Sequence, residues 1–226
     1  MIYPILLSIK VAIIATLISF IAGIFFSRLF FIKNFPGKEI IEAIFFLPMV
    51  LPPTVTGFIL LILFGKYGPL GFLIRKIFNS QLLFTWWAAV IASSIVAFPL
   101  MYQSAKAAFE SVDIKQERAA RILGANELRV FCTVTMPLAW PGILSGIVLS
   151  FARAIGEFGA TLMTAGNIPG KTQTIPMAIY FAVESGDYKT AVYLVVVIIL
   201  FSFGLIFWLN WLSRKKVLYY TKKERQ

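Results

Sequence analysis

Long apolar runs separated by short polar intervals dominate the sequence, and this pattern predicts helices that cross a membrane. A crossing needs about 20 consecutive, mostly apolar residues. The runs that meet this length are residues 5–31, 40–64, 86–104, 138–158 and 188–212. Because the first run is long and no basic segment precedes it, we expect a span there and not a cleaved signal peptide. We therefore predict an all-α integral membrane protein with five full spans, or six helices if the short stretch 175–183 is counted.

The second run contains three prolines, Pro48, Pro52 and Pro53. Proline removes an N–H donor and disturbs the preceding helical turn. In lipid, the freed carbonyl groups must find partners in the protein or in a wet cavity, and Thr54 and Thr56 offer hydroxyls for this purpose. The run is either a kinked packing helix or a broken helix that lines a passage.

Small residues recur every fourth position in the fourth run, where they form a stripe on one helix face. Such a stripe allows a neighbouring helix to approach closely. Its members are Gly142, Gly146, Ser150 and Ala154.

The longest polar interval, residues 106–137, predicts two short helices in water. Residues 113–116 suit a capping box that opens the first helix, and Gly124 suits its C-terminal end. Asn126 suits the cap of a second helix, which we expect to end before Pro137. From the residues alone, this interval is either a solvated connector or a docking element for a soluble partner.

Composition supports the membrane assignment. Hydrophobic residues make up 59% of the chain, whereas soluble proteins have about 45–50%. The net charge of +11 comes from residues between the apolar runs, which form no single basic face and so do not suggest nucleic-acid binding. With one cysteine and no histidine, a disulfide framework and a Cys/His metal site are excluded. We expect the cysteine, Cys132, to be a small buried residue.

The distribution of basic residues predicts the orientation in the membrane. Fourteen lysines and arginines fall in the turn after the first run, the polar interval and the tail 213–226, and five fall on the opposite side. Because basic residues collect on the cytoplasmic side, we expect the polar interval and the C-terminal tail in the cytoplasm and the N-terminus outside.

Arg153 and Glu157 lie inside the fourth run, four residues apart. A charge at the centre of a membrane helix costs about 2.5–3.5 kcal/mol, so it normally faces protein or water. The two side chains can pair on one helix face. The pair is either a structural ion pair, which we favour slightly, or a polar wall of a passage.

Residues 166–172 nearly match a phosphate-binding P-loop, but three residues separate the glycines where the motif needs four. We therefore expect a turn-rich loop and no ATPase activity in this chain. An ATP-independent secondary transporter is a weaker alternative, because the sequence has no internal repeat and Glu157 is taken as the one acid within a span. A membrane-embedded enzyme lacks a convincing catalytic set.

The polar interval resembles the cytoplasmic signature of ATP-binding-cassette (ABC) importer permeases. That signature reads acidic–Ala–Ala, three residues, Gly, nine residues, aliphatic, one residue, Leu-Pro. The chain matches it at Ala119, Ala120, Gly124, Val134 and Pro137. It departs in two places: Arg118 occupies the acidic position, with Glu117 one residue earlier, and Met136 replaces Leu.

Two further stretches, residues 47–58 and 153–180, resemble molybdate/tungstate permeases, with sulfate/thiosulfate permeases as the close alternative. The resemblance covers nearly the whole chain and implies a single permease domain, residues 1–226, with the fold of a type I ABC importer transmembrane domain. The implied function is oxyanion import across the plasma or inner membrane by alternating access. The implied partners are a second copy of the chain, two cytoplasmic ATPase subunits that bind ATP and Mg, and an external oxyanion-binding protein, with no cofactor in this chain.

The resemblance also implies which residues act. Residues 106–137 become a coupling loop whose helix docks on the ATPase, and the implied coupling residues are Glu117, Arg118, Ala119, Ala120, Gly124, Ala125 and Pro137. The residues expected along the translocation path are Pro52, Pro53, Thr54, Arg153, Gly156, Glu157 and Thr161.

Overall fold

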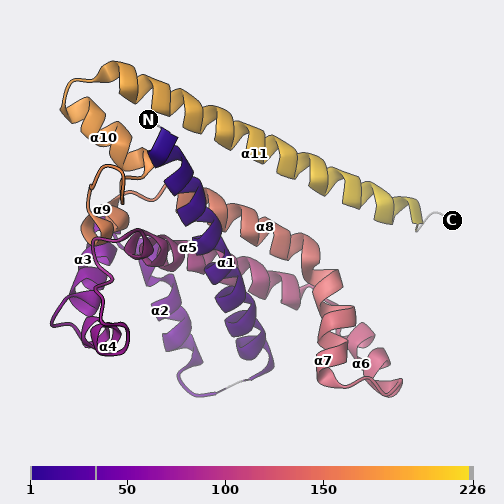
Figure 1. Ribbon diagram of the computed structural model, residues 1–226. Helices are drawn as coiled ribbons and strands as arrows, with labels where there is room; N and C mark the ends of the chain where they lie inside the picture. The colour runs from indigo at the N-terminus through magenta and orange to yellow at the C-terminus, as the bar shows by residue number, and fades with distance from the viewer. Residues whose placement is uncertain (1, 34, 224–226) are drawn as a thin grey trace. The chain divides into compact units, whose positions relative to one another are not determined.

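The computed structural model describes residues 2–33 and 35–223, with side chains described as far as residue 204 and at Phe207. Helices make up most of this part of the chain, and it contains no strand (Figure 1). The helices are α1 (Ile2–Ile32), α2 (Lys38–Val50), α3 (Pro53–Phe64), α4 (Pro69–Phe78), α5 (Trp86–Glu110), α6 (Ile114–Ile122), α7 (Glu127–Val130), the π-helix η1 (Phe131–Thr135), α8 (Met136–Ile155), α9 (Gly159–Ala165), α10 (Ile175–Glu184) and α11 (Tyr188–Lys223).

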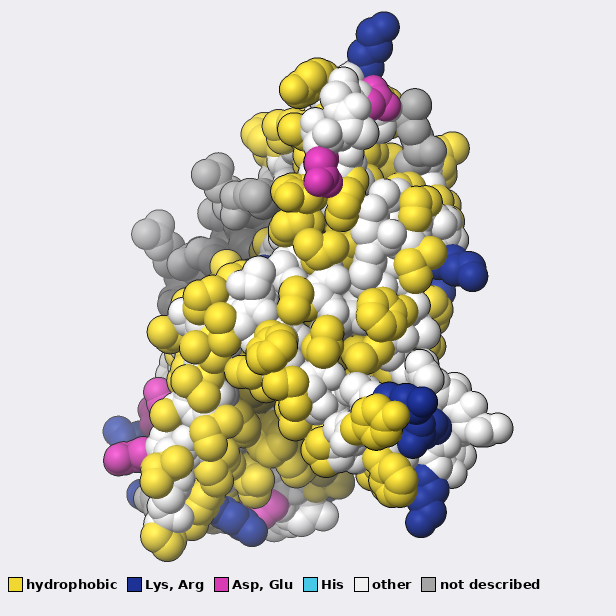
Figure 2. Space-filling model, turned by 90° about the vertical axis from the view of Figure 1, so that its left-hand side faces the viewer, with side chains coloured by type: hydrophobic (Ala, Val, Ile, Leu, Met, Phe, Trp, Pro, Cys, Tyr) yellow, Lys and Arg dark blue, Asp and Glu magenta, His cyan; other side chains and the backbone are white. Residues whose placement is uncertain are grey.

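Three helices in the described residues are long and apolar enough to cross a membrane: α1, α5 and the continuous helix Glu127–Ile155. The bent pair of α2 and α3 adds a fourth span if it is counted as one. The predicted fifth span is helical throughout within α11, but most of its side chains beyond residue 204 lie outside the described residues, as do those of the basic tail 213–226. Figure 2 shows hydrophobic side chains over much of the visible surface, as expected for a protein that faces lipid.

The chain divides into two compact units, residues 2–174 and 175–223. In the second unit, α10 packs against the start of α11. In the first, α1, α5 and α8 pack against one another and enclose fully buried side chains such as Met101, Tyr102 and Ile143. The first unit holds every residue of the two predicted functional sets.

The small-residue stripe of α8 packs against α5 of the same chain. A Cβ atom added at Gly142 would lie 2.7 Å from the Cβ of Ala108, and one at Gly146 would lie 2.7 Å from the Cβ of Ser104. Farther along, the Ser150 hydroxyl donates to the carbonyl of Ala97 at 3.3 Å. The predicted close approach is therefore confirmed, and larger residues could not be accommodated there.

The proline-rich second run is a broken helix. Helix α2 ends at Val50, Leu51 is extended, and α3 begins at Pro53 with a bend of 117°. Proline at the first position of a helix costs no hydrogen bond, because an N–H at that position would have no partner inside the helix. The second run is thus broken and not merely kinked.

Helix α2 buries none of its side chains within the chain. Its Glu42 carboxylate accepts hydrogen bonds from the Lys106 ammonium at 2.8 Å and from the Tyr102 hydroxyl at 2.7 Å, both on α5. The assumption that Glu157 was the one acid within a span was therefore wrong, since Glu42 lies in the second run. Its charge is compatible with a span because Lys106 neutralises it.

The second helix of the polar interval does not end before Pro137, contrary to prediction. Helix α7 continues through η1 into α8 as one helix. In η1 the Met136 N–H donates to the carbonyl of Phe131, five residues earlier. This wider turn directly precedes Pro137, so the helix accommodates a residue that has no N–H. Cys132, in the same segment, is exposed and not buried as predicted.

Residues 166–174 form the expected turn-rich loop. The Thr172 hydroxyl donates to the carbonyl of Gly166 at 2.7 Å and accepts from the N–H of Ile168 at 3.0 Å. Closed on itself in this way, the loop leads from α9 to the start of the second unit.

Candidate functional site: the coupling loop

Helix α6 has well-defined caps at both ends. The Asp113 carboxylate accepts a hydrogen bond from the N–H of Lys115 at 2.9 Å, which caps the N-terminus. At the other end, the N–H of Gly124 bonds to the carbonyl of Arg121 and the N–H of Ala125 bonds to that of Ala120. This pair of bonds is a Schellman motif, and it needs the positive φ of +83° that Gly124 adopts. The predicted start and stop of α6 are confirmed.

Helix α7 follows directly. The Asn126 side chain accepts a hydrogen bond from the N–H of Arg129 at 2.8 Å, so the predicted cap is confirmed. With both ends of α6 and the start of α7 capped, α6, the turn and α7 form a short unit of defined shape.

Large apolar side chains project from this unit into solvent. Ile122 is 85% exposed, Leu123 is 87% exposed and Leu128 is 73% exposed. Ala119 is exposed and Ala120 is half-buried beside them. Apolar groups clustered on a polar segment are typical of a docking surface for another protein. We call Ala119, Ala120, Ile122, Leu123 and Leu128 the apolar docking face.

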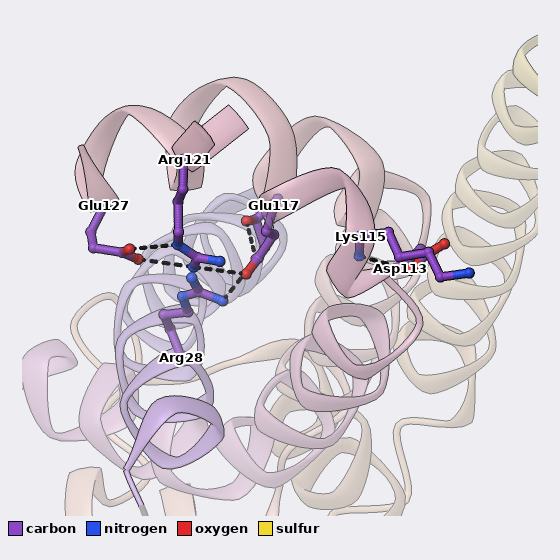
Figure 3. A network of polar contacts seen from close by, with 7 residues as sticks. Arg28, Asp113, Lys115, Glu117, Arg121 and Glu127 are labelled. Carbon is purple, nitrogen blue, oxygen red and sulfur yellow. Dashed lines mark hydrogen bonds and ion pairs between the residues drawn. The ribbon is translucent and has the colours of Figure 1, made fainter. Parts of the chain in front are cut away.

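Glu117 has a different environment from its neighbours. Its side chain is only 7% exposed and accepts a hydrogen bond from the Thr135 hydroxyl at 2.5 Å. Its carboxylate also pairs with Arg28 of α1 at 3.3 Å and with Arg121 at 3.1 Å. Arg121 in turn pairs with Glu127 of α7 at 2.6 Å (Figure 3). The polar side of α6 is thus tied to three other elements.

The ionisation of Glu117 follows from these contacts. Burial raises the pKa of its carboxyl group, but the hydrogen bond from Thr135 and the charges of Arg28 and Arg121 outweigh this effect. The pKa therefore lies below the ordinary value of 4.5, and the carboxylate is charged at neutral pH.

The predicted coupling residues are close together but differ in exposure. Arg118, Ala119, Gly124 and Pro137 are exposed, Ala120 and Ala125 are half-buried, and Glu117 faces inward. Sequence reasoning missed Arg28 and Thr135, which lie far from Glu117 along the chain. It also missed Ile122, Leu123 and Leu128, which could have been found as large apolar residues inside the longest polar interval.

In the predicted translocation set, Arg153 and Glu157 form the expected ion pair at 2.7 Å. The other carboxylate oxygen of Glu157 accepts from the N–H of Ala160 at 2.8 Å, which ties the end of α8 to the start of α9. Glu157 is 2% exposed, whereas the side chain of Arg153 is 31% exposed. The contacts of the carboxylate are therefore within the chain, and Arg153 retains an accessible surface.

The rest of this set lies around the junction between α3 and α9. A Cβ atom added at Gly159 would lie 2.9 Å from the Cβ of Pro53 and 3.2 Å from the backbone nitrogen of Thr54. Thr161 is buried, and its hydroxyl has no hydrogen-bond partner among the described residues. The remaining members, Pro52 and Gly156, are exposed. The structure thus brings the break in the second run next to the turn after α8.

A cavity of about 480 Å³ between α1, α2, α3 and α5 is lined mainly by apolar side chains, among them Phe26, Phe45 and Phe98. Such walls offer an anion few hydrogen-bond donors, so this cavity is a poor candidate for an oxyanion path.

The family model of the binding-protein-dependent transport system inner membrane component matches residues 8–217. The chain belongs to this family. It is accordingly a multi-pass membrane protein and a component of a transport system, which removes the ground for the membrane-embedded enzyme alternative.

Similar members of the family come from several bacteria. The putative molybdenum transport system permease protein YvgM of Bacillus subtilis (strain 168) is 50% identical over 207 residues, which cover 92% of this chain and 91% of YvgM. The molybdenum transport system permease protein ModB of Escherichia coli (strain K12) is 43% identical, covering 94% of each chain. The sulfate transport system permease protein CysT of the same strain is 31% identical, covering 90% of this chain and 73% of CysT.

Solved structures with the same fold include the inward-facing MetNI methionine ABC transporter, with a TM-score of 0.73 and 15% identity over 95% of this chain and 94% of that one. A bacterial ABC transporter for the import of alginate gives a TM-score of 0.74, also at 15% identity, over 95% of this chain and 79% of the other. The predicted fold, a type I ABC importer transmembrane domain, is confirmed.

Proposed function

We propose that this chain is the permease subunit of an ATP-driven importer that moves molybdate or tungstate into the cytoplasm by alternating access. The observation that carries the proposal is the capped α6–α7 unit with its apolar docking face, in a membrane protein of this family. The relatives named molybdenum permeases match more closely than the sulfate permease, at 43–50% against 31% identity. They therefore favour molybdate over sulfate.

The proposed assembly contains two copies of the chain, two cytoplasmic ATPase subunits and an external oxyanion-binding protein. ATP and Mg bind the ATPase subunits, and the apolar docking face inserts into a cleft on each of them. Removing exposed apolar side chains from water supplies the affinity. The oxyanion passes near the junction of α3 and α9, where the exposed part of Arg153 offers a positive charge.

The first experiment tests the docking. Ala120→Glu places a charge on the apolar docking face, and Gly124→Val forces a β-branched residue into a positive φ, which costs about 1–2 kcal/mol. We expect both variants to reach the membrane as dimers but to co-purify with much less ATPase and to lose most molybdate uptake. Gly170→Val is the matched control, because Gly170 has a similar φ of +76° and open space around it but lies in another loop.

Retention of the ATPase and wild-type uptake in both variants would refute the proposed docking.

The orientation in the membrane can be tested in the same cells. We propose that α6–α7 and the C-terminal tail are cytoplasmic and that the N-terminus is external. A thiol reagent added outside should therefore label a cysteine introduced at Gly170 and not one introduced at Asn126. Uptake of sulfate in preference to molybdate would favour the alternative substrate.

A further inference from the structure

Helix α6 is attached to the rest of the chain in an unusual way. Of its nine residues, all of which the structure describes, Glu117 alone is buried. The helix thus has no apolar side chain inserted into the core. Instead, the buried carboxylate of Glu117 attaches the helix, on the side of α6 that faces away from solvent.

The partners of Glu117 come from the two helices that lead into the membrane. Arg28 lies in the last turns of α1, and Thr135 lies in η1, directly before α8. The Arg28 guanidinium is also 5.3 Å from the ring centre of Phe131, so it contacts η1 as well as Glu117. Glu117 therefore joins α6 to the ends of both α1 and α8.

An exposed and therefore weak contact also links the carboxylate to α7. Arg121 pairs with Glu117 on one side and with Glu127 on the other, at 3.1 Å and 2.6 Å. Because α7 is continuous with α8, a displacement of the α6–α7 unit must either carry α1 with it as well or break the buried contact with Arg28. Breaking a buried pair is strongly unfavourable, because it leaves an uncompensated charge.

We propose that Glu117 is a positioning residue that transmits the movement of α6–α7 to α1, since α7 is already continuous with α8, and that it does not contact the ATPase. This assignment rests on the proposed function and revises one member of the coupling set, since Glu117 is buried whereas Ile122, Leu123 and Leu128 are exposed. Arg28 is the receiving residue on α1, and Thr135 of η1 holds the carboxylate in place.

The experiment uses the complete importer, permease with ATPase and binding protein, reconstituted in liposomes. Three quantities are measured for each variant: the ATPase that co-purifies, the rate of ATP hydrolysis, and molybdate uptake per ATP hydrolysed. The test variants are Glu117→Gln and Arg28→Gln, which break the same contact from its two sides. Glu127→Gln is the matched control, because Glu127 also pairs with Arg121 but its side chain is 68% exposed.

We expect Glu117→Gln and Arg28→Gln to retain the ATPase and its hydrolysis, while uptake per ATP falls at least about fivefold, the lower end of typical coupling effects. Glu127→Gln should stay close to wild type, since exposed ion pairs contribute little. Arg28→Lys should recover part of the uptake, because it restores the charge and not the full guanidinium geometry.

Uptake per ATP at the wild-type level in Glu117→Gln would overturn the proposal, and so would loss of the co-purifying ATPase, which would make Glu117 a docking contact. If Glu117→Gln fails to reach the membrane, Arg28→Gln decides by the same two criteria. Failure of the proposed function is recognised separately, because the wild-type complex would then lack bound ATPase or molybdate uptake.

Discussion

Two Arg–Glu pairs with the same spacing serve different purposes in this chain. Glu117 and Arg121 are four residues apart on α6, and Arg153 and Glu157 are four residues apart at the end of α8. Both glutamates are almost fully buried, and both arginines keep about a third of the side chain exposed. By spacing alone, the two pairs are equivalent.

Their remaining contacts differ. Glu117 is bound by Arg28 and Thr135, which come from other helices, whereas Glu157 is bound by the backbone N–H of Ala160, three residues ahead. The first pair connects elements that are distant along the chain, and the second stabilises a local break between α8 and α9. The spacing of Arg and Glu predicts that the two side chains pair, but the further contacts of the glutamate distinguish the two roles.

The largest effect is expected from Glu157→Ala. The change leaves the Arg153 guanidinium without its partner and the N-terminus of α9 without its acceptor, which should lower the free energy of unfolding by about 3–5 kcal/mol. Thermal unfolding of the purified chain in detergent measures this loss. Glu157→Gln should cost less, because an amide oxygen can still accept from Ala160. Glu184→Ala, at an exposed glutamate, is the control; equal midpoints for Glu184→Ala and Glu157→Ala would contradict a structural role for Glu157.

A smaller effect is expected from Gly146→Leu. This change tests how closely α8, the helix between the two ion pairs, packs against α5. The added side chain would collide with Ser104 and Met101 of α5, and overpacking of this kind typically costs about 1–3 kcal/mol. Yield and unfolding temperature should both fall. Gly204→Leu is the matched control, because a Cβ added there would meet no atom within 4 Å among the described residues, apart from its chain neighbours and the backbone of its own helix. Equal behaviour of the two variants would show that α8 and α5 are not closely packed in the membrane.

The smallest effect concerns pH. Because the pKa of Glu117 lies below 4.5, its stabilising contribution is fully present above the ordinary carboxyl value and is lost as the pH falls through the lowered one. The difference in unfolding temperature between wild type and Glu117→Gln should thus be constant from about pH 8 to about pH 5.5 and shrink at more acidic pH. A difference that changes near neutral pH would contradict the lowered pKa.

Features that depend on neighbouring residues were predictable from the sequence. The caps at Asp113 and Asn126, the stop at Gly124 and the small-residue face of α8 follow from local chemistry and helical periodicity, and all four are confirmed. The family was also predicted correctly, because the motif that identifies it consists of residue spacings that can be read from the sequence itself.

The features that were missed depend on contacts between distant segments. No pattern links Arg28 to Glu117, or Glu42 to Lys106, because each pair is brought together only by helix packing. The continuation of α7 through Pro137 depends on a π turn, for which the sequence carries no recognised signal. Cys132 was expected to be buried from its apolar neighbours, but its position on the helix surface decides its exposure.

The break between α2 and α3 also has a consequence for length. At 1.5 Å per residue, the 13 residues of α2 extend about 20 Å and the 12 residues of α3 about 18 Å. Neither half reaches across a hydrocarbon layer of about 30 Å. If the two halves form one span, the break falls inside this layer, and the N–H groups of the first turn of α3, which have no partner inside the helix, must face protein or water. We expect this edge of the molecule to be turned away from the bilayer.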